Sequence, residues 1–208
     1  MSERLNSIGA GVVCLAACLS AGIAMGAPAA MTRAELINIA KSGVGYSYYW
    51  GHGSWRTDGA SHGSCSGNCP SCTHSGTYGA DCSGFAAKVW QVPSPSSVDV
   101  DKHPYSTSNF YSDMTHWKEI TWKELLPGDA LVHRTSTSGH IVVWEKGDPW
   151  GASWVYECKG CSYGCVHNTK NITSDYKAIR RNLVTEDPVV TDAGIDTGLV
   201  DTGTTVDA

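Results

Sequence analysis

The hydrophobic pattern predicts two helices separated by a long polar segment. Thr32–Glu35 has the form of a capping box, and apolar positions between 36 and 40 predict one side of a helix that ends at Gly43. A second helix is predicted to begin near Cys82, because apolar residues recur at helical spacing until Pro93 stops it. The first half of the domain is therefore expected to be helical around a polar insertion.

The second half of the chain reads as strands. Apolar and alternating runs predict strands at Ala130–His133, His140–Glu145 and Ser153–Glu157, and Leu126–Asp129 has the residues of a turn. Residues 51–80 are rich in Gly, Ser, His and Cys, which indicates a long irregular insertion. A helix followed by a small antiparallel sheet is the order of an α+β fold.

The first thirty residues predict export. Between Ile8 and Ala30 the chain is mildly hydrophobic, uncharged and rich in small residues, as in a signal peptide cleaved near 27–30. A second interpretation is a lipobox at Leu15–Cys18, with Cys18 lipidated, which would make the protein an outer-membrane lipoprotein. Both interpretations predict a periplasmic or extracellular domain, with no stable membrane span in the mature chain apart from a lipid on Cys18.

The negative net charge of the protein comes from the C-terminal end of the chain. Residues 185–208 carry six acidic residues and no Lys or Arg, so they are expected to be a disordered acidic tail. The predicted folded domain, residues 31–184, holds 14 basic and 13 acidic residues and is nearly neutral. No basic patch points to nucleic acid as a partner, and the domain is expected to be a monomer.

Seven of the nine cysteines lie beyond the predicted signal, and six of these form two groups with mirrored spacing. The groups are Cys65, Cys69, Cys72 and Cys158, Cys161, Cys165. An oxidising compartment favours three disulfides, whose pairing the sequence leaves open among about 15 arrangements, and no metal or cofactor is then expected. The competing interpretation is a zinc site with thiolate ligands and His62 or His74. Cys82 is left without a partner in either case.

Cys82 is the candidate nucleophile. In the first turn of a helix it lies among unpaired backbone N–H groups, which favour a thiolate and can hold an oxyanion. Asp81 is the expected N-cap, and Gly84 allows another segment or a substrate to approach closely.

His140 is the candidate base, because it begins a predicted strand that would hold its ring rigidly at a pocket edge. A third polar group should orient the imidazole. Glu157 ends the next predicted strand, one hairpin away, and is the first choice for this role. His167 and Asn168 are the alternatives.

Four segments follow one another along the chain: the aromatic segment Tyr46–Gly53, the nucleophile motif Asp81–Phe85, the turn Leu126–Asp129 and the histidine strand Gly139–Val142. In these motifs and their order, residues 32–160 resemble the NlpC-type cell-wall endopeptidases, a papain-like group. The resemblance implies a papain-like core in which the nucleophile helix packs on a small antiparallel sheet. The cysteine-stapled loops depart from the common family pattern.

The resemblance also implies a reaction and further site residues. The family hydrolyses amide bonds in peptidoglycan stem peptides through a thioester. By position, Tyr48 matches a tyrosine that assists the oxyanion, and Asp81 and Ser83 match residues lining the pocket for the free amine of the stem. Glu157 stands where the family often has histidine and CHAP amidases have glutamate. The alternatives are therefore a CHAP-like amidase or acyltransferase on the same dyad, or a non-catalytic wall-binding or metal-binding module.

Overall fold

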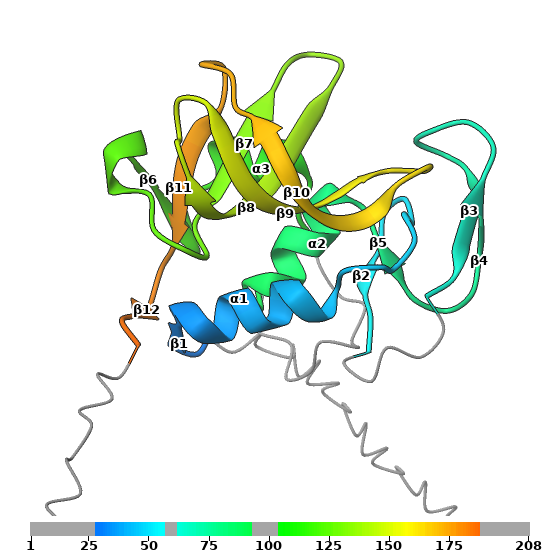
Figure 1. The fold of residues 1–208 in the computed structure, drawn as a ribbon, viewed down its shortest axis with the longest axis horizontal. Helices are drawn as coiled ribbons and strands as arrows, with labels where there is room; N and C mark the ends of the chain where they lie inside the picture. Colours follow the sequence, from blue (N-terminus) through cyan, green and yellow to red (C-terminus); the bar gives the residue numbers. More distant parts are fainter. Residues whose placement is uncertain (1–27, 57–61, 93–103, 188–208) are drawn as a thin grey trace, which may run out of the picture.

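The computed structural model describes residues 28–56, 62–92 and 104–187. Helices α1 (Arg33–Ser42), α2 (Cys82–Val89) and α3 (Thr107–Ser112) accompany an antiparallel sheet, so the predicted α+β class is confirmed (Figure 1). Almost all of the expected signal, including Cys18, lies outside the described residues, as does most of the expected tail.

The main sheet has six strands in the order β10-β9-β8-β7-β11-β6, and every neighbouring pair is antiparallel. The predicted strands are present as β7, β8 and β9. Strands β6, β10 and β11 were not predicted, because they are short or largely polar and take their place only by pairing with a neighbour. The strands are β6 (Trp117–Ile120), β7 (Ala130–Arg134), β8 (Gly139–Gly147), β9 (Ala152–Gly160), β10 (Gly164–Asn171) and β11 (Lys177–Arg181).

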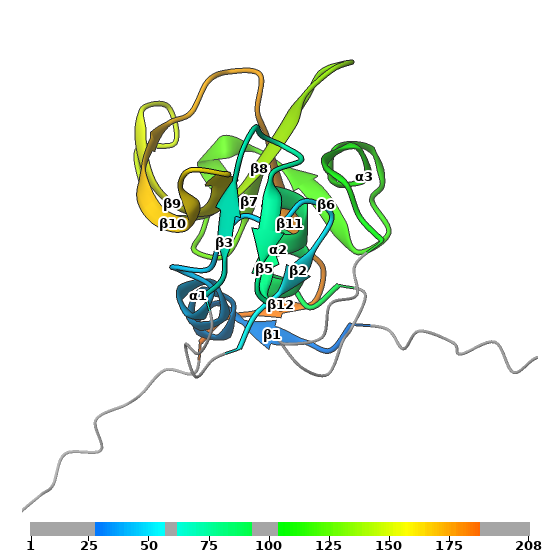
Figure 2. The same ribbon diagram turned by 90° about the vertical axis from the view of Figure 1, so that its right-hand side faces the viewer.

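The segment expected to be irregular, residues 51–80, contains short strands. β2 (Gly53–Ser54) pairs with β5 (Gly79–Ala80) (Figure 2), and β3 (Ser64–Ser66) pairs with β4 (Thr73–Ser75) as a hairpin that lies beside the main body in Figure 1. In its described residues the insertion thus contains paired strands rather than open loop alone. Outside this segment, a single-turn 3-10 helix spans Trp122–Glu124.

Helix α2 packs against the sheet, and both faces of the sheet are covered. Ile141 and Val143 of β8 join the core formed with α2, whereas Val142 and Trp144 join a second apolar cluster on the opposite face. Side chains alternate along a strand, so a strand covered on both sides needs a continuous apolar run. This explains why residues 141–144 are all apolar.

Helix α1 begins as predicted, and the chain beyond residue 184 contributes to that start. Thr32 forms the capping box with Glu35. β1 (Met31–Thr32) pairs in parallel with β12 (Val184–Thr185), and Asp187 Oδ1 accepts a hydrogen bond from Ala34 N at 2.8 Å. The first N–H groups of a helix lack intrahelical partners and attract acidic groups. Residues 185–187 therefore belong to the folded domain, which extends past the boundary expected at 184.

No helix within the described ranges has both the length and the apolar character that a membrane crossing requires.

Candidate active site

Asp81 fixes the start of the nucleophile helix. Its Oδ1 accepts hydrogen bonds from Gly84 N and Ser83 Oγ, each at 2.8 Å, and its Oδ2 accepts from Gly51 N at 2.8 Å. The predicted N-cap is confirmed. Because the buried carboxylate has donors from two segments, it joins the aromatic segment of residues 46–53 to the first turn of α2.

The close approach expected at Gly84 is made by the chain itself. A Cβ placed on Gly53 would lie 2.4 Å from the carbonyl oxygen and 2.7 Å from the Cα of Gly84. Both neighbouring atoms belong to the backbone, so neither can move aside easily. Strand β2 therefore lies directly against the first turn of α2, and a glycine is required on β2 for this contact.

A cleft of about 760 Å³ opens at the start of α2. Five of the six predicted catalytic and substrate-binding residues line it: Tyr48, Asp81, Cys82, Ser83 and His140. The sixth, Glu157, is fully buried behind His140. The fold thus gathers residues that span more than a hundred positions of sequence.

Glu157 is the residue that contacts the candidate base. The distance between His140 Nε2 and Glu157 Oε2 is 2.5 Å. Asn168, one of the alternatives, donates from Nδ2 to Glu157 Oε1 at 3.1 Å and so contacts the carboxylate rather than the imidazole. Nε2 of His167, the other alternative, lies 3.0 Å from Glu145 Oε2, so this imidazole contacts a different carboxylate.

The electrostatics keep Glu157 ionised. Burial raises its pKa, but the hydrogen bond and charge of His140 and the nearby ammonium of Lys170, at 3.3 Å, lower it, and the net pKa is below its usual value. A carboxylate accepts only, so Nε2 of His140 carries the hydrogen and the lone pair of the neutral ring lies on Nδ1. Nδ1 is then the nitrogen that can take a proton.

The Cys82 thiol is protonated at rest. Burial and the charge of Asp81 raise its pKa to about 12, although backbone hydrogen bonds from Ile141, Ser83 and Cys82 itself act in the opposite direction. The helix-terminal amides thus favour the thiolate as expected, but burial outweighs them. A group in this state needs a base before it can act as a nucleophile.

The sulfur of Cys82 lies against the histidine strand. Its backbone partner Ile141 directly follows His140 in β8. Among the described residues no hydrogen bond joins the Cys82 sulfur to the His140 ring. In enzymes without substrate such contacts are often long and tighten on binding, so the geometry is that of two groups facing one cleft.

Tyr48 keeps its phenol proton. Burial is the main cause that raises the pKa of its hydroxyl, and its neighbours Cys82 and Asp81 raise it further. The backbone of Tyr48 also forms an isolated parallel β-bridge with Ala80, just before the start of α2. A neutral tyrosine beside the sulfur is a hydrogen-bond donor available to an oxygen that becomes negative there.

The six grouped cysteines pair as three disulfides, and their mirrored spacing has a structural meaning. The outer members of each group pair with one another, as Cys65–Cys72 and Cys158–Cys165. The middle members, Cys69 and Cys161, join the two groups. Cys82 is the cysteine without a disulfide in the described chain, and the disulfides fit an exported protein.

Two parts of the site escaped prediction from the sequence. Lys170 contacts Glu157 from β10, a strand that the polar sequence did not reveal. Arg134 and Lys159 stand exposed at the edge of the cleft and give it basic groups. The alternating positions Val166, Asn168 and Lys170 were the signal in the sequence for this strand. The segment is mostly polar, however, so the sequence alone suggests a solvent-exposed loop, and its pairing with β9 is what makes it a strand.

No family model, curated protein or solved structure matches this chain. The resemblance to NlpC-type endopeptidases therefore rests on the four motifs and their order.

Proposed function

We propose that this protein is a cysteine peptidase that hydrolyses amide bonds in peptidoglycan stem peptides. The observation that carries the reaction class is the contact between buried Glu157 and His140, which lines the same cleft as Cys82 at the start of α2. A nucleophile, a base and a group that orients the base are the three parts needed for acyl transfer. The order of the motifs supports the substrate class, and α2 packed on an antiparallel sheet supports a papain-like core.

The reaction begins with proton transfer from Cys82 to Nδ1 of His140. The thiolate attacks the carbonyl carbon of the substrate, and the resulting oxyanion accepts hydrogen bonds from Cys82 N and the Tyr48 hydroxyl. Glu157 stabilises the imidazolium, which then protonates the leaving amine as the C–N bond breaks. A thioester remains on Cys82.

Water completes the cycle. His140 takes a proton from the water molecule, whose oxygen attacks the thioester carbon. The C–S bond breaks, the sulfur takes the proton back from His140, and a carboxylic acid product leaves. No cofactor enters either half of the reaction.

The charges of the cleft suit a zwitterionic peptide. Asp81 and Ser83 supply oxygen atoms at the nucleophile for a free amino group, while Arg134 and Lys159 at the edge attract carboxylates. Peptidoglycan stem peptides carry both kinds of group. Attraction between opposite charges would orient such a substrate along the cleft.

A second candidate is an amidase of the CHAP type, favoured by the glutamate that contacts His140. Both candidates use the same residues and differ in the bond cleaved. Mass spectrometry of the products from defined muropeptides separates them, since an amidase releases the whole stem from the sugar and a peptidase cuts within the stem.

The same digest tests catalysis. Cys82→Ala and His140→Ala should each abolish product formation, whereas His167→Ala should leave it nearly unchanged. His167 is the matched control because its imidazole also pairs with a glutamate, Glu145, and does not line the cleft. Product formation by Cys82→Ala at the wild-type rate would refute the mechanism.

A further inference from the structure

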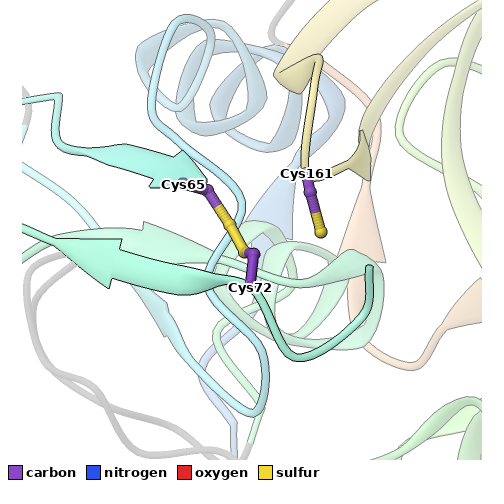
Figure 3. Close-up of side chains that lie close together, drawn as sticks. All are labelled: Cys65, Cys72 and Cys161. Atoms are coloured by element: carbon purple, nitrogen blue, oxygen red, sulfur yellow. A yellow bond between two sulfur atoms is a disulfide. The ribbon is translucent and has the colours of Figure 1, made fainter. Parts of the chain in front are cut away.

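Two of the disulfides lie close together, and one of them lines the cleft through Cys69. The sulfur atoms of Cys65, Cys72 and Cys161 all lie within 4.8 Å of one another, and the side chain of Cys161, in the β9–β10 turn, lies beside the Cys65–Cys72 bond of the hairpin (Figure 3). Cys69 is bonded to Cys161. Four sulfur atoms from two distant segments therefore form one cluster, which we call the hairpin cluster.

The hairpin cluster has the number and kind of ligand atoms of a thiolate zinc site, since three of its sulfurs lie within 4.8 Å of one another and the fourth, Cys69, is bonded to one of them. Zinc binds four thiolates tetrahedrally at about 2.3 Å, which places neighbouring sulfurs about 3.8 Å apart. Cys161 N donates to Cys69 Sγ at 3.0 Å, a contact that also stabilises a thiolate bound to a metal. Once both disulfides are reduced, the sulfurs of each pair are free to move apart toward this separation.

The histidines near the hairpin cluster already have other contacts. His74 Nε2 lies 2.8 Å from Ser47 Oγ, and its ring stacks on Tyr49 at 3.8 Å. His62 packs edge-on against Tyr46 at 4.7 Å. Cys69 is therefore the better fourth ligand, and the set consists of sulfur alone.

We propose that the hairpin cluster, once its two disulfides are reduced, binds one Zn²⁺ through Cys65, Cys69, Cys72 and Cys161. A phosphine reductant gives each disulfide two electrons and is itself oxidised to the phosphine oxide, with the oxygen and both protons coming from water. Four thiols result, and Zn²⁺ displaces their protons as it binds. The disulfide and zinc states use the same atoms and exclude each other.

Exposure selects which bonds open. Cys69 is exposed and the other three members of the hairpin cluster are partly exposed, whereas Cys158 and Cys165 are buried. Accessible disulfides are the ones reduced first. The buried pair is thus expected to persist while the hairpin cluster changes state.

The zinc state would preserve the cleft under reducing conditions. Cys69 and Pro70 from the hairpin line the cleft together with Lys159 and Gly160 from the β9–β10 turn, and the Cys69–Cys161 bond joins these two walls. A reduced Cys82 is needed for catalysis, a point that rests on the proposed function, and a reductant that protects it also opens exposed disulfides. Zinc would restore the connection between the walls.

The test uses the full chain carrying Cys82→Ala, so that the nucleophile cannot serve as a ligand. After treatment with the phosphine and its removal, the protein is titrated with Zn²⁺ against a chromogenic chelator, and with Co²⁺ for thiolate charge-transfer bands. One metal ion per chain is expected. Adding Cys161→Ser should weaken binding by at least about 10-fold, whereas adding Cys165→Ser should leave it unchanged.

A second measurement needs no further substitution. In the reduced Cys82→Ala chain, bound Zn²⁺ should slow alkylation of the four cysteines of the hairpin cluster, read by peptide mass. No metal uptake after reduction, or equal binding by the oxidised chain, would overturn the proposal. Equal loss in the Cys165→Ser chain would also overturn it. These readouts do not depend on hydrolysis, so failure of the zinc site and failure of the proposed function are distinguishable.

Discussion

Replacing Glu157 with glutamine removes the negative charge that faces His140 and keeps the size of the side chain. The carboxylate lies 2.5 Å from His140 Nε2 and is fully buried. Glutamine can still accept a hydrogen bond, but it cannot balance the charge of the imidazolium that forms in the reaction. Glu157→Gln is therefore expected to slow catalysis with little change in substrate binding.

The size of the effect follows from the contact. A hydrogen bond to a charged group contributes about 1.5–3 kcal/mol, and each 1.36 kcal/mol corresponds to about a tenfold change in rate. The kcat of Glu157→Gln should therefore fall about 10- to 150-fold, with KM changed by less than about threefold.

The assay is the initial rate of muropeptide hydrolysis over a range of substrate concentrations. Glu145→Gln is the matched control, because Glu145 Oε2 lies 3.0 Å from His167 Nε2 in a similar pair away from the cleft. Its kcat should stay within about twofold of the wild type. An equal loss of kcat in the two variants, or an unchanged kcat in Glu157→Gln, would refute the assigned role.

The same substitution has a pH signature in stability. The folded-state pKa of Glu157 is lower than its ordinary value of 4.5. Its contribution is therefore fully present above about pH 4.5 and is lost as the pH falls through the lower folded value. The difference in unfolding free energy between wild type and Glu157→Gln should be largest above pH 4.5 and shrink below it, measured by urea denaturation.

Three further predictions concern the nucleophile, the helix contact and the turn. In His140→Ala, alkylation of Cys82 by iodoacetamide should be slow at neutral pH and rise steeply only toward pH 12, because burial raises the thiol pKa to about 12. Gly53→Ala should lower the free energy of unfolding by about 1–3 kcal/mol, since its Cβ would lie 2.4 Å from Gly84 O. Asp129→Asn should cost about 3 kcal/mol, because the buried carboxylate pairs with two arginines. Urea denaturation measures both changes.

Each of these has a contrasting outcome. Rapid alkylation of Cys82 in His140→Ala at neutral pH would mean that the thiolate forms without the base. Gly151→Ala is the control for Gly53→Ala, because a Cβ there meets only the movable carboxylate of Asp148 at 2.9 Å; equal destabilisation would contradict the steric argument. An Asp129→Asn protein as stable as wild type would show that the ion pairs contribute nothing net.

The sequence by itself determined the parts of the site that depend on neighbouring residues. The sequence predicted the capping box at Thr32, the N-cap at Asp81 and the strands β7, β8 and β9. Each of these depends on hydrogen bonds between near neighbours or on the alternation of apolar and polar residues within one short segment. Cys82 stood out as the cysteine outside the two mirrored groups.

Only the tertiary structure determined the features that depend on contacts between residues far apart in the sequence. It chose the disulfide pairing, since spacing alone does not say which sulfurs face each other. The polar segments β10 and β11 become strands only because they pair with neighbouring strands of the sheet. The fold also buries Glu157 and brings Lys170 beside it. It also set the protonation of Cys82, because the sequence shows the helix amides that favour a thiolate but not the burial that outweighs them.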